Sequence, residues 1–78
     1  MITIEKKLKK IFSVIFKINE KNIKKSSSFK NIKKWDSLNH IKLIMSIESK
    51  FHISIDPEES LKFINFGQIL NFLKKKVK

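Results

Sequence analysis

The middle of the chain reads WDSLNHIKLIMSIESKF over residues 35–51, a polar opening followed at once by a run rich in apolar residues. Asp36 and Ser37 both favour the N-cap position, so a helix is predicted to begin at one of them and to end near Phe51. Its apolar positions are Leu38, Ile41, Leu43, Ile44, Met45, Ile47 and Phe51. They cover more than half of the helix circumference, and plain core packing is the expected role for most of them. The segment therefore predicts a central helix that packs on both flanks and holds the Ser37 hydroxyl at its exposed end.

A further amphipathic helix is predicted at the start of the chain. Thr3 is suited to its N-cap, and apolar residues recur every three or four positions from Ile4 to Ile15. The pattern fades near Asn19, and residues 19–34 are rich in Lys, Asn and Ser without sustained periodicity. This stretch predicts an unusually long connection. Three apolar residues are expected to hold it to the core, namely Ile23, Phe29 and Ile32.

Two more helices are predicted after the central one. Asp56, Pro57 and Glu59 have the spacing of an N-cap, a proline at the first helical position and a capping-box glutamate, which predicts a short helix to about Phe63. A second capping box is predicted from Asn65 and Gln68, and it opens a last helix that continues towards Val77. The two-residue alternation at Ile53 and Ile55 is too short to indicate a strand, so a loop is expected there. The fold class is therefore all-α, a small four-helix bundle with a long first loop and a short third helix.

Length and composition narrow the classes of protein further. A chain of 78 residues has room for a single domain, expected over residues 1–78. The absence of cysteine excludes disulfides, thiolate metal sites and a nucleophilic thiol of the protein itself. The sequence has no apolar run long enough to span a membrane and no segment like a signal peptide at Met1 to Lys10. We therefore expect a soluble, cytoplasmic and monomeric protein.

The formal net charge of +11 requires a separate explanation. Strongly basic small proteins are natural candidates to bind nucleic acid or anionic membranes, so a basic helical binding module is the alternative from another class. All 18 basic residues are lysine, however, and Lys, Ile, Asn and Phe, which have A/T-rich codons, make up more than half of the chain. A surface built to bind phosphate would more often include bidentate arginine. We therefore favour nucleotide bias as the main cause, and we expect no nucleic-acid partner.

The sequence shows no catalytic set. The two histidines, His40 and His52, and the seven carboxylates do not have the spacing of a metal site or of a nucleophile–base pair. His40 lies near Ser37 at helical spacing, but a Ser–His pair without an orienting acid or oxyanion donors supports an enzyme only weakly. We therefore expect neither intrinsic catalysis nor a bound metal.

Local chemistry allows two interpretations of Ser37. As a cap, its hydroxyl would only satisfy a helix N–H group. As an attachment point, it would hold a phosphate ester close to roughly half a positive charge and to the unpaired N–H donors of the helix N-terminus. Cap serines are common and modified serines are rare, so local chemistry alone favours the cap.

The wider sequence reverses that preference, because it resembles the acyl carrier protein family. Residues 35–51 are similar to the second helix of these proteins, in which the serine of Asp-Ser-Leu holds a 4'-phosphopantetheine arm. The resemblance extends upstream through residues 4–11 and 26–29, and downstream from residues 55–59 to Phe72. It implies a carrier fold, a covalent 4'-phosphopantetheine on Ser37, and acyl cargo held as a thioester. The implied pathway is fatty acid biosynthesis or a dedicated acyl, polyketide or surface-glycan pathway. The resemblance also implies that acyl chains can bind between the helices, beside the second helix.

The same resemblance implies a set of partners. A phosphopantetheinyl transferase would move the arm from coenzyme A onto Ser37, a ligase or acyltransferase would load its thiol, and a downstream synthase or transferase would take the cargo. Asp36 would help the transferase to dock, and Leu38 would supply an apolar contact. Asn39 and Lys42 belong to a polar sector of the central helix that is expected to face partners. An aminoacyl carrier, D-alanyl or peptidyl, is the alternative within the class.

The charge of this sector departs from the family pattern. Members that serve fatty acid synthesis typically have an acidic second helix that meets basic patches on enzymes, whereas here Lys33, Lys34, Lys42 and Lys50 are nearby in sequence. Since juxtaposed like charges suppress wrong partners, we expect a dedicated pathway whose enzymes present acidic or apolar surfaces. Trp35 occupies the position of a small residue in housekeeping carriers, which favours the same interpretation.

Overall fold

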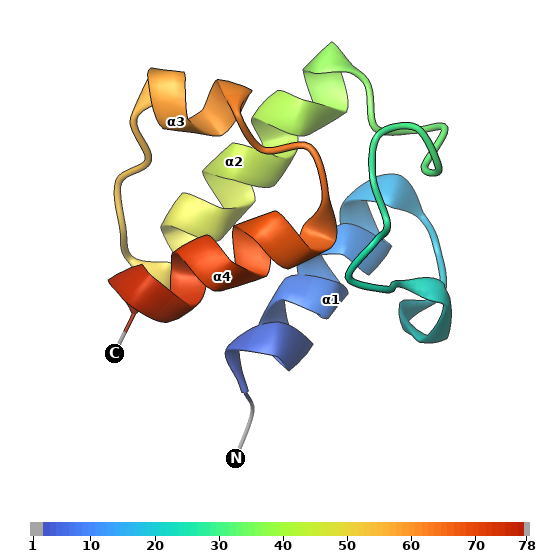
Figure 1. Ribbon diagram of the computed structural model, residues 1–78, viewed down its shortest axis with the longest axis horizontal. Helices are drawn as coiled ribbons and strands as arrows, with labels where there is room; N and C mark the ends of the chain where they lie inside the picture. The colour runs from blue at the N-terminus through green and yellow to red at the C-terminus, as the bar shows by residue number, and fades with distance from the viewer. Residues whose placement is uncertain (1–2, 78) are drawn as a thin grey trace.

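The computed structural model describes residues 3–77 and contains four α-helices in that range. The helices are α1 (Ile4–Phe16), α2 (Ser37–Phe51), α3 (Pro57–Leu61) and α4 (Phe66–Lys76), and a short 3-10 helix, η1, covers Glu20–Asn22. Figure 1 shows α1 and α2 running in opposite directions, with α4 in front and α3 at one end of the molecule. Apart from an isolated bridge between Ser28 and Asn65, residues 3–77 form no strand pairing. The predicted all-α fold with four helices, a long first loop and a short third helix is confirmed.

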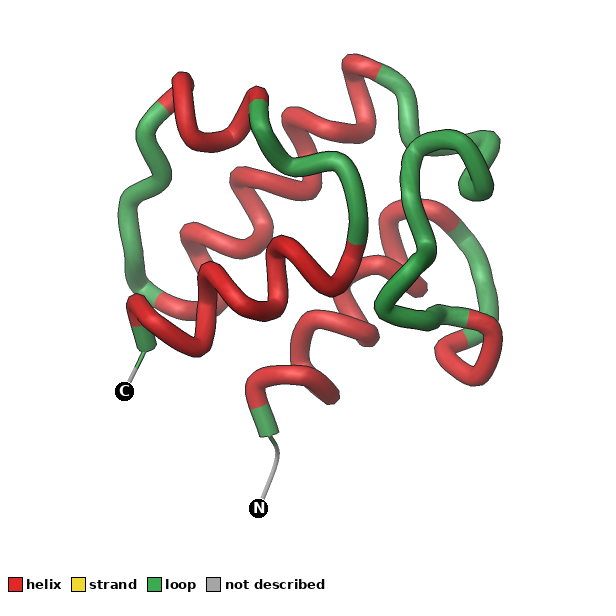
Figure 2. Tube along the Cα trace, in the orientation of Figure 1, coloured by secondary structure: helices red, strands yellow, loops and turns green. Residues whose placement is uncertain are grey.

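The starts of α1 and α2 follow the predicted capping chemistry. Thr3 Oγ1 accepts a hydrogen bond of 3.1 Å from the backbone N–H three residues on. Asp36 Oδ1 does the same for Asn39, at 2.9 Å, so Asp36 is the N-cap and Ser37 the first helical residue. Both helices end at a residue in the left-handed conformation, Lys17 after α1 and His52 after α2. The long connection between them winds around one end of the bundle (Figure 2).

The predicted capping box of α3 is wrong. The side chain of Asp56 occupies the N-cap position but makes no capping hydrogen bond. Pro57 at the first position has no N–H and fixes its own φ, so this short helix needs less help from a cap. The helix also ends at Leu61, two residues earlier than the predicted Phe63.

The start of α4 is close to the prediction but differs in one bond. Asn65 Oδ1 accepts from the N–H of Gln68 at 2.7 Å, as a cap should. The Gln68 side chain accepts from the N–H of Ile64 at 2.8 Å, one residue before the cap, rather than from that of Asn65. Gly67 lies in the first turn, where its N–H donates to the Lys25 carbonyl at 3.0 Å. The long connection is therefore bonded directly to the start of the last helix.

Aromatic side chains form the centre of the core beneath the long connection. Phe12 makes edge-to-face contacts with Phe16, Trp35 and Phe66, with ring centroids 5.0 to 5.4 Å apart. Two of the three residues expected to hold the connection, Ile23 and Ile32, are buried. The third prediction is wrong, because Phe29 is 49% exposed. Its backbone, rather than its side chain, makes the contact, since its N–H donates to the Ile64 carbonyl at 3.3 Å.

Candidate functional site

The Ser37 side chain is exposed at the first position of α2. The N–H groups of Ser37 and Leu38 have no acceptor within the helix, because the first turn of any helix lacks preceding carbonyls. The Asp36 side chain bonds to the third of these groups, on Asn39, and does not use the other two. The hydroxyl is therefore open to another protein, in the positive field of a helix N-terminus.

Trp35 fixes the chain two residues before Ser37. Its indole is only 7% exposed and lies in the aromatic core, stacked on Phe16 at 5.3 Å between ring centroids. The backbone N–H of Trp35 donates to the Ile32 carbonyl at 3.0 Å, and this bond closes the turn before Ser37. The large Trp35 side chain thus fills space in the core. This packing explains a large residue at position 35 without any contact to a partner.

His40 connects this segment to α3. The indole N–H of Trp35 donates to His40 Nδ1 at 2.9 Å, and His40 Nε2 lies 2.8 Å from the carbonyl oxygen of Ser60. Because an indole can only donate and a carbonyl can only accept, these bonds select the neutral tautomer with the proton on Nε2. Neither ring nitrogen is left to take a proton from Ser37. The geometry therefore gives no support to the Ser–His interpretation.

The polar residues predicted to face partners have different environments. Asp36 and Lys42 are exposed, as are Lys33 and Lys34 in the preceding turn. Asn39 is half-buried, and its side-chain amide donates to the Lys34 carbonyl at 2.7 Å. Asn39 therefore holds the turn against α2 in addition to bordering Ser37.

The structure shows an exposed apolar surface on α2. Leu43, Ile47 and Phe51 are buried as expected, whereas three other apolar residues, here called the exposed stripe, are Leu38 (63% exposed), Ile41 (57%) and Met45 (63%). The exposure of Leu38 suits the partner contact expected for it, but that of Ile41 and Met45 was not predicted. At 100° per residue, positions 38, 41 and 45 lie on the side of the helix opposite positions 43, 47 and 51. The spacing in the sequence separates these two groups, but it does not show which of them is exposed.

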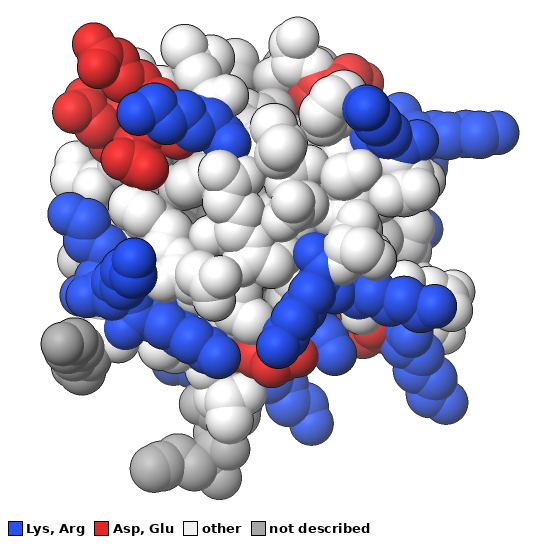
Figure 3. All heavy atoms as spheres, in the orientation of Figure 1, with Lys and Arg blue, Asp and Glu red and all other residues white. Residues whose placement is uncertain are grey.

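Charged side chains are unevenly distributed around the molecule. Asp56, Glu58 and Glu59 lie at the start of α3 and form the large red group at the upper left of Figure 3. Lysines dominate most of the remaining edge of the molecule in this view. The only ion pair within residues 3–77 joins Lys9 to Glu5, at 3.6 Å. In the same range there is no group of His, Asp or Glu side chains suited to a metal ion, and no helix is long and apolar enough to cross a membrane.

Comparison with known proteins identifies the family to which this arrangement belongs. Residues 6–73 match the family model described as a phosphopantetheine attachment site. The whole chain is 36% identical to an acyl carrier protein of Buchnera aphidicola subsp. Schizaphis graminum, over 78 residues that cover 99% of that relative. In this family a covalently attached 4'-phosphopantetheine holds acyl groups as thioesters, and its members in general act as carriers without catalytic activity. An exposed serine at the start of α2, a fold of four helices and a match over almost the full length all agree, and the chain belongs to the acyl carrier protein family.

Proposed function

We propose that Ser37 is the attachment point of the 4'-phosphopantetheine arm and that residues 1–78 act as one carrier domain. The observation that supports this most directly is the exposed Ser37 hydroxyl at the N-terminus of α2, inside the matched segment. The arm supplies a terminal thiol, which the chain itself lacks because it has no cysteine. Tethered in this way, the cargo reaches each partner at a high effective concentration.

The residues around Ser37 fit a phosphodiester. The unpaired N–H groups at the start of α2 favour an anion there, and Lys33 and Lys34 are exposed in the turn before it. Asp36 is the one carboxylate beside the site, and its Oδ1 is bonded to the N–H of Asn39. The chain's contribution is to present the hydroxyl in a fixed position and to balance the charge of the ester, with no catalysis of its own.

Intact mass spectrometry tests the assignment. The wild-type chain and Ser37→Ala are incubated with coenzyme A and a promiscuous phosphopantetheinyl transferase. A phosphopantetheine-sized gain is expected in the wild type only. Asp36→Asn is a second variant, because asparagine still caps the helix and only the negative charge is lost. The rate of phosphopantetheine transfer to this variant should be lower, because Asp36 is expected to help the transferase to dock, while its free energy of unfolding should be unchanged. A wild type that gains no mass, or a Ser37→Ala chain that gains as much, would refute the proposal.

We further propose that partner enzymes dock beside Ser37 on Asp36, Leu38, Asn39 and Lys42. Leu38 is largely exposed and suits an apolar contact, while Lys42 gives this side of α2 a positive charge. These features favour enzymes with acidic or apolar docking surfaces in a dedicated pathway. We also propose that the chain acts in the cytoplasm. Loading rates with a housekeeping fatty-acid enzyme and with a cognate ligase should differ strongly. Equal rates would count against a dedicated pathway.

A further inference from the structure

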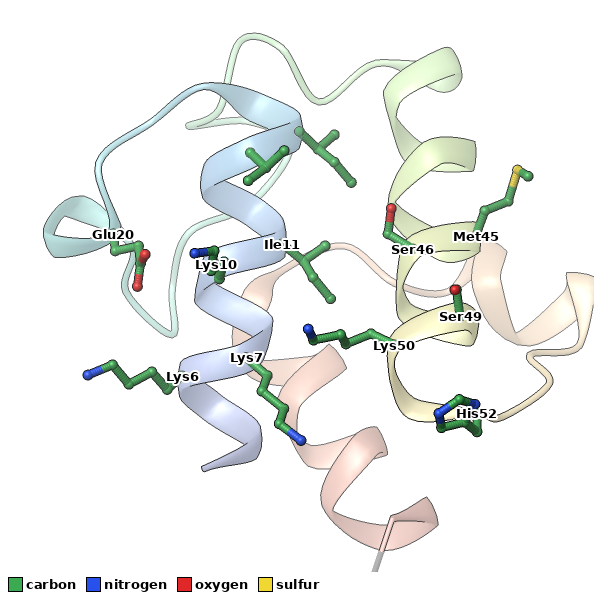
Figure 4. Close-up of a pocket in the computed structure, with 12 residues that line it drawn as sticks. Lys6, Lys7, Lys10, Ile11, Glu20, Met45, Ser46, Ser49, Lys50 and His52 are labelled. Atoms are coloured by element: carbon green, nitrogen blue, oxygen red, sulfur yellow. The ribbon is translucent and has the colours of Figure 1, made fainter. Parts of the chain in front are cut away.

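A groove of about 960 Å³ lies between α1 and α2, away from the Ser37 hydroxyl. Side chains of both helices line it, as Figure 4 shows, and Lys50 extends across it towards α1. Ile11 and Met45 are among its apolar lining residues, and Val14, 66% exposed, stands at its edge. Met45 also belongs to the exposed stripe, so the groove continues the apolar surface that begins beside Ser37. We call this hollow the α1–α2 groove.

The α1–α2 groove has an apolar end and a cationic end. Because α1 and α2 run in opposite directions (Figure 1), Val14 and Ile15 near the end of α1 lie on the Ser37 side. Lys7 from the start of α1 and Lys50 from the end of α2 lie at the other end, whereas Figure 4 shows Lys6 and Lys10 on the side of α1 turned away from α2. Apolar contact and positive charge are therefore separated along the groove.

These lysines are not neutralised within the described part of the chain. The single ion pair found there uses Lys9, and Glu20 is the one carboxylate that lines the groove. Lys50 is exposed, so it can turn to meet an anionic group. Lys7 lies with its Nζ 6.0 Å from the centre of the Phe51 ring, which keeps it at the mouth of the groove.

We propose that the α1–α2 groove binds an amphipathic helix of a partner enzyme, apolar towards Ser37 and acidic towards Lys7 and Lys50. The inference rests on the proposed function, because it supplies a second contact for enzymes that act at Ser37. A helix fits the dimensions: the ten residues of α1 from Lys6 to Ile15 span about 14 Å, which two to three turns of a partner helix would cover. Opposite charge at one end and apolar contact at the other would fix its direction.

Other occupants match the groove less well. A flat membrane surface would contact projecting residues rather than a concave floor. Nucleic acid would leave Ile11 and the apolar residues beside it without a counterpart, and the chain has no arginine to pair with phosphate. An amphipathic protein helix can contact the apolar end with apolar side chains and the cationic end with carboxylates.

The test uses a synthetic probe and the full chain labelled with ¹⁵N. The probe is a peptide of about 18 residues, long enough to form a helix, with leucines on one face of one half and glutamates on the other half. Amide shifts are expected at residues 6–15 and 45–52. In Lys7→Gln/Lys50→Gln the affinity should fall by about fivefold, from the loss of two charge contacts.

A matched variant separates the groove from net charge. Lys62→Gln/Lys74→Gln removes the same number of lysines elsewhere, and it should bind the probe like the wild type. An equal loss in both double variants, or amide shifts outside the groove, would overturn the proposal. So would binding to vesicles of phosphatidylcholine and phosphatidylglycerol that fails only in the groove variant, because the surface would then be a membrane contact.

The same variants distinguish this inference from the carrier function. If the wild type and the groove variant both gain the phosphopantetheine mass but the probe does not bind, only the groove proposal fails. If the wild type gains no mass, the carrier proposal fails, and the peptide map still decides whether the groove binds an acidic helix.

Discussion

At the scale of single residues, the contacts of His40 explain how Ser37 is positioned. The imidazole accepts from Trp35 in the core and donates to the carbonyl of Ser60 on α3, so it joins the turn before the site to the third helix. Its ring also lies nearly parallel to the indole, with 17° between the planes. A histidine that resembled a catalytic base in the sequence is therefore a positioning residue in the structure.

Replacing His40 by alanine is expected to lower the free energy of unfolding by about 1–3 kcal/mol, because the buried indole N–H of Trp35 loses its acceptor. Urea unfolding followed by far-UV circular dichroism measures the change. Trp35→Phe removes the donor, so adding His40→Ala to that variant should cost less than it costs in the wild type. Equal costs in both backgrounds would mean that the bond contributes nothing to stability.

At the scale of elements, α4 is fixed by its contact with the long connection. A Cβ at Gly67 would lie 3.0 Å from the carbonyl oxygen and 3.2 Å from the Cβ of Lys25. That carbonyl already accepts a hydrogen bond from the Gly67 N–H, so it cannot move away freely. This close approach favours glycine over any larger residue, whereas the sequence shows only that it lies in a first turn.

Gly67→Ala should therefore destabilise the protein by about 1 kcal/mol, although alanine is the better helix former. Asn71→Ala, at an exposed position of the same helix, is the control for helix propensity and should be neutral or slightly stabilising. Thermal unfolding of both variants measures the difference. A Gly67→Ala protein as stable as Asn71→Ala would show that the connection yields easily.

Helices were the part of the fold that the sequence predicted best. Capping side chains at Thr3 and Asp36 and the periodic apolar residues depend on neighbours along the chain, so the N-cap of α1 could be predicted to the residue and that of α2 to one of two residues. The exposure of Leu38 and Met45 depends on which element covers each face of α2, and the sequence of one helix does not contain that information. For the same reason Phe29 was expected in the core and lies outside it.

The candidate site was predictable to a similar extent. The position of Ser37 at a helix start follows from local chemistry, and its role follows from resemblance to a family. The bond between His40 and Ser60 joins residues 20 positions apart, and the α1–α2 groove joins two helices across the long connection. Neither could be inferred from spacing in the chain.

At the scale of the whole molecule, the excess of lysine acts against compactness. A net charge of +11 is held in a body of 31 × 30 × 19 Å, with one ion pair among residues 3–77. Repulsion at such a density opposes folding and weakens as salt shortens the screening length. The stability of this carrier should therefore depend on ionic strength.

Raising sodium chloride from about 0.01 M to about 0.1 M shortens the Debye length from about 30 Å to about 10 Å. We expect the Tm to rise by about 5 °C, which corresponds to about 1 kcal/mol for a domain of this size. Scanning calorimetry measures it, and Lys62→Gln/Lys74→Gln/Lys75→Gln should respond less because it has three fewer charges. A Tm that stays constant or falls would show that the lysines do not repel one another appreciably.

The burial of Trp35 also gives the molecule an intrinsic optical reporter. It is the only tryptophan, the chain has no tyrosine, and its indole lies two residues from Ser37 in contact with an imidazole and two phenylalanine rings. Emission excited at the red edge of the absorption band therefore arises from one place in the molecule. We therefore expect attachment of the arm and loading of cargo to change the emission of the purified carrier, which needs no added label.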